Sequence, residues 1–248
     1  NTSIKEVYNN LIQEAHFFVS QNNYKDHIIH LVINHIIVDE FTELEKVIED
    51  IKIKSLKLEI KFICLKKKIL DNISNAFKKN NLKILKLYCS SYVKTIYFKD
   101  KIKKKDTVFF IDIGFERTSI IAFDKSKLKF FKTIPLGGNN ITKDISKVLK
   151  LNLDYSEELK IKLNEDDKFG SFNKEIQNKI NPYSEILEKN ISIKLLKKVI
   201  KARIDEIIEL AIYKNNYFEE IKSHKKPNLI LLGGGSKLLA NDNNLDLK

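Results

Sequence analysis

The spacing of apolar residues along the chain predicts alternating helices and strands. Residues 3–19 place apolar side chains three or four positions apart, which forms one stripe along a helix. Other segments are short apolar runs rich in Ile, Val and Phe, a composition typical of strands. In the first hundred residues the predicted helices are 3–19, 42–51, 67–77 and 90–97, and the predicted strands are 28–33, 35–39, 57–65 and 82–89.

The pattern continues after a basic loop at 99–106 with a predicted hairpin. Two apolar runs flank a short polar turn, and the first run ends in Asp112-Ile113-Gly114. A bare hairpin needs a turn residue but no acid at this point. Beyond the hairpin we predict a strand over 127–136, a helix over 140–151, a polar and mainly helical region over 152–200, an amphipathic helix over 193–218 and a strand that ends at Gly233.

Three glycine turns suggest a reason for that acid. Six of the seven glycines lie in turns that each close a strand-like run: Gly114, Gly137, Gly138, Gly233, Gly234 and Gly235. Glycine lets backbone N–H groups approach an anion closely, although a single glycine at a strand end is more often only a turn. A carboxylate repels a phosphate unless a cation lies between them, so Asp112 indicates Mg²⁺ held through water. With the hydroxyl of Thr118, these groups form half of a nucleotide-phosphate clamp.

A charged pair in the polar region fits the same hypothesis. Glu157 and Lys160 are three residues apart, so on a helix they share one face. The acid is suited to contact ribose hydroxyls and the lysine to lie beside a base. A surface ion pair explains the same spacing, and on spacing alone it is the more common explanation.

Charge and composition exclude few functions. The chain has 45 Lys+Arg against 33 Asp+Glu and a formal charge of +12, which is compatible with a nucleic-acid or anionic-membrane partner. The lysines are spread over nearly every segment, which instead favours a general compositional bias. No apolar run reaches the roughly 20 residues that span a bilayer. The chain has no methionine, begins at Asn1 and stops soon after a glycine turn, so we expect a fragment that lacks both ends.

The order of these motifs resembles the actin-like ATPase superfamily and, within it, the FtsA family of bacterial cell-division proteins. The resemblance covers essentially the whole chain. It rests on the runs FIDIGFERTSIIAFD, IPLGGNNITKDISKVL, SEELK and LILLGGGSKLL. They are similar to the family's second phosphate loop, connecting segment, nucleoside motif and adenosine motif. The chain departs from the pattern at Phe115, Glu116 and Arg117, where relatives usually carry glycines and threonine.

The resemblance implies an α/β fold: a partial actin-like (RNase H-like) ATPase fold with an inserted small α/β 1C subdomain of SHS2 type. It places a helix of subdomain 1A at 1–24, subdomain 1C at 25–85 and the return to 1A at 86–105. Subdomain 2A follows at 106–145 and 201–248, with 2B at 146–200 between its two parts.

The resemblance also implies a function. ATP with Mg²⁺ would bind through Asp112, Gly114, Thr118, Gly137, Gly138, Glu157, Lys160, Gly233, Gly234, Gly235 and Ser236, with Asp112 holding Mg²⁺ through water. Hydrolysis would be weak at most. The protein would self-associate into filaments, bind FtsZ through 2B and other division proteins through 1C, and reach the membrane only through a C-terminal helix absent from this chain. It would act in the cytoplasm, at the inner face of the membrane at the division site, without nucleic acid. Two alternatives from another class are a PilM-like actin-fold assembly scaffold and a basic nucleic-acid-binding module.

Overall fold

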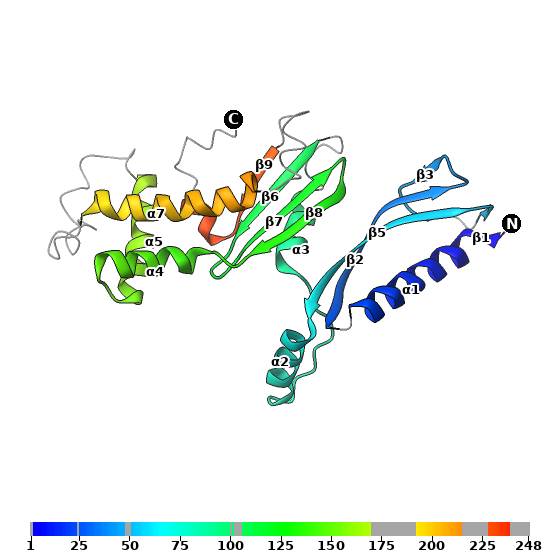
Figure 1. The fold of residues 1–248 in the computed structure, drawn as a ribbon, viewed down its shortest axis with the longest axis horizontal. Coiled ribbons are helices and arrows are strands. Elements are labelled where there is room, and N and C mark those ends of the chain that lie inside the picture. Colours follow the sequence, from blue (N-terminus) through cyan, green and yellow to red (C-terminus); the bar gives the residue numbers. More distant parts are fainter. Residues whose placement is uncertain are drawn as a thin grey trace. The chain divides into compact units, whose positions relative to one another are not determined.

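A computed structural model describes residues 2–23, 25–47, 51–99, 101, 106–169, 192–214 and 228–238. The chain forms two compact units, the first made of 1–105 with 124–128, and the second of 106–123 with 129–248 (Figure 1). The predicted pieces 1–24, 25–85 and 86–105 therefore all lie in the first unit. Their assignment to separate subdomains stays a prediction.

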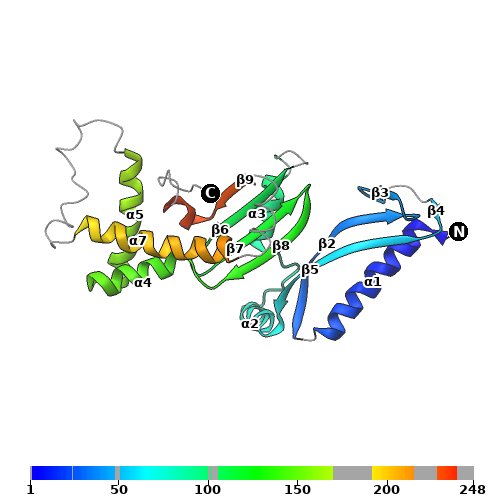
Figure 2. The same ribbon diagram turned by 45° about the horizontal axis from the view of Figure 1, so that its top comes forward.

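The first unit is built on a three-stranded sheet in the order β3-β2-β5. Helix α1 begins after Ser3, whose hydroxyl oxygen accepts the backbone N–H of Glu6 at 3.3 Å and so caps the helix. Figure 2 shows α1 lying along β5, with which it is in contact. The elements of this unit are β1 (Thr2–Ser3), α1 (Ile4–Asn22), β2 (Asp26–Val38), β3 (Thr42–Leu44), β4 (Lys52–Ile53), β5 (Leu56–Lys66), α2 (Lys67–Lys78) and α3 (Ser90–Lys99).

The long strand β2 corrects one prediction, because it replaces the two strands expected at 28–33 and 35–39. It pairs with β5 in antiparallel register, with irregularities between Ile28 and His30 and between Ile33 and His35. Each irregularity leaves one residue of β2 without a partner in the ladder. At the second of these positions, the side chain of Asn34 makes contacts outside the sheet.

Two other predictions for this unit are wrong. The helix predicted over 42–51 gives way to strand β3, which pairs with Ile36–Val38 of β2. Leu44 and Val47 pack against a small core formed by Ile4, Val38 and Ile53. The strand predicted over 82–89 has no strand partner among the described residues.

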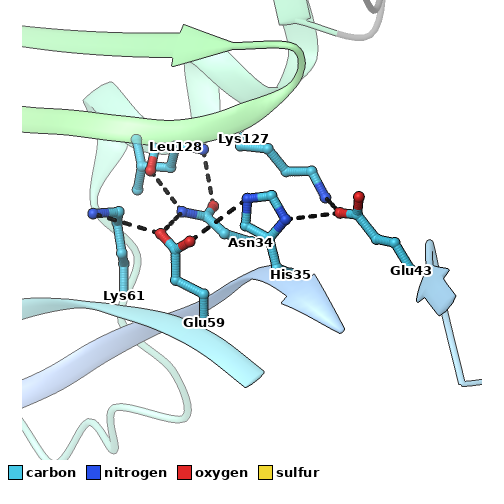
Figure 3. Close-up of polar contacts among 7 residues, drawn as sticks. All are labelled: Asn34, His35, Glu43, Glu59, Lys61, Lys127 and Leu128. Carbon is cyan, nitrogen blue, oxygen red and sulfur yellow. Dashed lines mark hydrogen bonds and ion pairs between the residues drawn. The ribbon is translucent and has the colours of Figure 1, made fainter. Parts of the chain in front are cut away.

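A turn at 124–128 belongs to the first unit through polar contacts of its last two residues (Figure 3). The side chain of Asn34 donates to the carbonyl oxygen of Leu128 at 2.8 Å and accepts the backbone N–H of Leu128 at 2.9 Å. Lys127 donates to Glu43 at 2.7 Å. Asn34 is buried, and its side-chain amide makes the two hydrogen bonds with the Leu128 backbone that the main chain of a neighbouring strand would otherwise make.

The second unit contains a four-stranded sheet in the order β8-β7-β6-β9. Every residue of β6 is buried, as expected for a central strand. Strands β6 and β9 are parallel, with Val108 opposite Asn228 and Asp112 opposite Leu232, so their carboxyl ends lie at one edge. The strands are β6 (Thr107–Ile113), β7 (Thr118–Asp124), β8 (Lys127–Ile134) and β9 (Asn228–Leu232).

Helices α4 and α7 of the second unit run side by side in both views and pack against each other (Figures 1 and 2). They share one hydrophobic core with the inward side chains of β6 and β7. Buried residues of that core include Phe109, Ile111, Ile120, Ile141, Ile145, Leu196, Ile204 and Ile208. The helices are α4 (Gly138–Leu149), α5 (Leu153–Phe169) and α7 (Ile193–Ile208), with a π-helical turn at Glu209–Tyr213 and a 3-10 turn at Gly234–Leu238. The predicted helical residues 215–218 lie outside the described residues.

Candidate functional site

The three glycine turns meet at one cavity of about 310 Å³ in the second unit. Gly114 follows β6, Gly138 begins α4, and Gly234 and Gly235 follow β9. The parallel pairing of β6 and β9 explains how the first and last turns come together, because both strands end at the same edge. Helix α5 adds a wall made of Glu157, Lys160 and Ile161. The lining residues are Gly114, Phe115, Gly138, Glu157, Lys160, Ile161, Gly234, Gly235, Lys237 and Leu238.

The turn after β9 packs directly on the end of β6. Gly233 has a left-handed φ of 85°. A Cβ at this position would lie 2.7 Å from the Asp112 carboxylate oxygen Oδ1 and closer still to the carbonyl oxygen of Ile113. A Cβ at Gly235 would overlap the side chain of Ile113. Gly234 differs, because apart from its own chain neighbours no atom of the described residues lies within 4 Å of the position its Cβ would take. This glycine therefore leaves open space at the wall of the cavity.

The loop after β6 is fixed to the start of α4. The backbone N–H groups of Gly138 and Asn139 donate to the carbonyl oxygens of Gly114 and Phe115, at 2.9 and 2.7 Å. The side-chain amide of Asn139 donates to Glu116 at 2.6 Å. These N–H groups are already bonded to the loop, so their role is to hold the loop in place.

Five predicted site residues do not line the cavity, although they lie in the turns around it or at the strand ends next to those turns. Asp112 is 4% exposed at the end of β6, with its carboxylate beside Gly233. The Thr118 hydroxyl is fully buried and donates to the carbonyl oxygen of Leu136 at 2.7 Å. The Ser236 hydroxyl donates to the carbonyl oxygen of Gly233 at 2.7 Å.

Gly137, the fifth of these residues, has a structural reason to be glycine. A Cβ there would lie 2.5 Å from the carbonyl oxygen of Phe115. Its backbone N–H donates to the side-chain oxygen of Asn140 at 3.0 Å.

Sequence reasoning missed four lining residues: Phe115, Ile161, Lys237 and Leu238. Ile161 lies four residues after Glu157, so helical spacing offered a signal for it. Phe115 and Lys237 sit in turns, and no periodic pattern indicates which way a turn residue faces.

Glu157 and Lys160 form a partly enclosed ion pair rather than a surface one. The Lys160 ammonium donates to the Glu157 carboxylate at 2.6 Å, and Lys160 is only 6% exposed. Thr142 of α4 donates its hydroxyl to the same carboxylate oxygen. Burial acts to raise the pKa of Glu157, but the hydrogen bonds from Lys160 and Thr142 and the charge of Lys160 outweigh it and lower the pKa. Glu157 is therefore ionised at neutral pH.

Comparison with known proteins assigns the fold and the family. A family model described as "Cell division protein FtsA" matches residues 109–240, which is more than half of the 248 residues. The chain belongs to the FtsA family. The match to the FtsA model spans every lining residue of the cavity.

Two FtsA proteins show how far the similarity extends. The "Cell division protein FtsA" of Buchnera aphidicola subsp. Schizaphis graminum (strain Sg) is 24% identical over 245 residues, which cover 94% of this chain and 56% of that protein. The protein of the same name from Bacillus subtilis (strain 168) is 31% identical over 127 residues, covering 50% of this chain and 28% of that protein. The chain thus spans 56% of the length of its Buchnera FtsA relative.

A solved structure confirms the predicted fold class. The "PilM-PilN type IV pilus biogenesis complex" aligns with a TM-score of 0.61 at 14% identity, over 94% of this chain and 58% of that chain. This FtsA-family chain therefore has the α/β actin-like fold in part. None of the helices in the described part of the chain has the length and apolar character needed to cross a bilayer.

Proposed function

We propose that this chain is the nucleotide-binding part of an FtsA-type cell-division protein and that ATP binds in the cavity. The observation that carries the proposal is the convergence of Gly114, Gly138 and Gly234 with the Glu157 carboxylate on one cavity. Its volume of about 310 Å³ lies at the lower end of the range, roughly 300–1,000 Å³, that is usual for ligand pockets.

The proposed roles follow from the chemistry of the lining groups. At Gly234 a ligand can approach the backbone closely, because no Cβ fills the open space. Glu157 is an ionised acceptor suited to ribose hydroxyls, and the positive charge of Lys237 suits phosphate. Asp112 would hold Mg²⁺ through water from the buried end of β6. A bound Mg²⁺ would neutralise phosphate charge.

The wider function is proposed from the family. The protein would polymerise through head-to-tail contacts, link FtsZ to the cytoplasmic membrane through subdomain 2B and a C-terminal helix, and hydrolyse ATP weakly at most. Residues 106–145 and 201–248 would form 2A, residues 146–200 would form 2B, and residues 25–85 would form 1C. A PilM-like assembly scaffold is the second candidate, because the PilM-PilN likeness covers 94% of the chain. That likeness concerns the fold alone, whereas the sequence matches are to FtsA.

Thermal unfolding of the product of the complete gene tests nucleotide binding. Ligand at one hundred times its Kd stabilises a protein by about 2.7 kcal/mol, so the midpoint should rise by several degrees with Mg-ATP. Inorganic tripolyphosphate with Mg²⁺ is the control, because a +12 chain attracts any polyanion. Equal shifts with both ligands, or no shift with millimolar Mg-ATP, would reject the proposed function.

A further inference from the structure

Thr142 of α4 was not predicted as a site residue, yet its hydroxyl contacts three residues that line the cavity. The residue is 3% exposed on α4. Its hydroxyl oxygen lies 3.2 Å from the carbonyl oxygen of Gly138, accepts a hydrogen bond from Lys160 at 2.9 Å and donates to Glu157. A hydroxyl has one hydrogen to give and two lone pairs to offer. Thr142 therefore links Gly138, Glu157 and Lys160 from behind the cavity wall.

The Lys160 ammonium is fully used within the protein. It donates to the carbonyl oxygen of Gly138 at 3.1 Å, to the Thr142 hydroxyl at 2.9 Å and to the Glu157 carboxylate at 2.6 Å. An ammonium has three N–H donors, so these three acceptors satisfy it completely. No donor remains for a ligand base, which differs from the role expected for this lysine from the family motif.

Glu157 is the group of this network that can still bind a ligand. Both hydrogen bonds reach its oxygen Oε2. The side chain is 33% exposed and lines the cavity, and Oε1 has no hydrogen-bond donor in the described part of the chain. A carboxylate held in this way accepts hydrogen bonds from hydroxyl groups and repels phosphate.

We propose that Thr142 and Lys160 are positioning residues: they hold the Glu157 carboxylate as an ionised acceptor for ligand hydroxyls, and Lys160 does not contact the base. This inference rests on the proposed function, because the ligand is the nucleotide proposed above. It predicts that substitutions at Thr142 and Lys160 affect only the part of nucleotide affinity that depends on the sugar hydroxyls.

The test compares ATP with 2′,3′-dideoxy-ATP, which lacks both hydroxyls, by calorimetry on the product of the complete gene with Mg²⁺. Thr142→Val and Lys160→Met should each weaken ATP binding by about tenfold or more, as expected for losing a hydrogen bond to a charged group. Binding of dideoxy-ATP should be nearly unchanged, and Thr142→Ser should bind ATP like the wild type. Thr95→Val is the matched control, because Thr95 is also a buried helical threonine that donates to a backbone carbonyl, that of Tyr92.

The results separate the two proposals. If either variant loses affinity for both nucleotides equally, Lys160 or Thr142 acts on the base or phosphates and the positioning role is overturned; unchanged ATP binding overturns it as well. If the wild type binds neither nucleotide, the proposed function fails. In that case the positioning role is tested by the pKa of the Glu157 carboxyl, followed by NMR without nucleotide. Thr142→Val and Lys160→Met should each raise this pKa, and an unchanged pKa in both variants would overturn the positioning role.

Discussion

Replacing Gly233 by alanine should destabilise the second unit strongly. A non-glycine residue in a left-handed conformation costs about 1–2 kcal/mol, and Gly233 has a φ of 85°. The added methyl would also meet the backbone of Ile113 and lie 2.7 Å from a carboxylate oxygen of Asp112. Neither group can move freely, because both belong to a fully buried strand. Forcing an extra carbon into a packed interior costs about 1–3 kcal/mol, so we expect a loss of about 2–5 kcal/mol in total.

Urea denaturation followed by far-UV circular dichroism measures this loss, with Gly234→Ala as the matched control. Typical urea m values of about 1–3 kcal/mol/M predict that the Gly233→Ala midpoint falls by about 0.7 M or more. Gly234 has open space for a methyl, so its alanine variant should differ from the wild type by less than about 1 kcal/mol. Hydrogen exchange of β6 assigns the loss to the second unit. Equal stability of the two variants would refute the packing of the β9 turn on β6.

Three further predictions concern other parts of the chain. Asn34→Leu leaves the buried N–H and carbonyl of Leu128 without their amide partner, so the free energy of unfolding should fall by about 2–4 kcal/mol. Hydrogen exchange of the Leu128 amide should also accelerate, and unchanged exchange would contradict the contact. The pKa of Glu157 is lowered in the folded protein, so its contribution to stability is present above the unfolded value of 4.5 and is lost as the pH falls through the lower folded value. The stability of Glu157→Gln should therefore depend less on pH in acid than that of the wild type. Superimposable curves of stability against pH for the two proteins would reject this. A chain with a charge of +12 should sediment with anionic vesicles at 0.01 M salt, where the Debye length is about 30 Å. It should not do so at 0.15 M salt, where the Debye length is about 8 Å. Sedimentation that resists salt would indicate an apolar anchor within these residues.

The glycine cavity could be predicted because its causes are local in the sequence. Strand β6 is central in its sheet and β9 pairs with it in parallel, and each appears as a continuous apolar run rather than an alternating one. Each run ends in glycine because another backbone or a side chain approaches closely there, as at Gly233 and Gly235. The helical spacing of Glu157 and Lys160 likewise placed both on the wall of the cavity.

The parts that could not be predicted depend on tertiary partners. Leu44 and Val47 fit helical spacing, but pairing of Thr42–Leu44 with β2 makes that segment a strand. Residues 82–89 are rich in apolar residues, as a strand is, yet a strand also needs a neighbour to pair with. The role of Thr142 depends on which acceptors surround the Lys160 ammonium, and the spacing of two charges along a helix contains no information about a third residue from another helix.

The most direct test of nucleotide binding in the cavity is calorimetric titration of Mg-ATP into the Gly234→Val variant of the complete gene product. Valine would place a Cβ and two methyl groups in the open space at Gly234, where the described part of the chain beyond the neighbouring residues has no atom within 4 Å of the Cβ position. The wild type should bind Mg-ATP, and the variant, with an unchanged unfolding midpoint, should lose most of that affinity. Equal affinity of the two proteins would contradict nucleotide binding in the cavity.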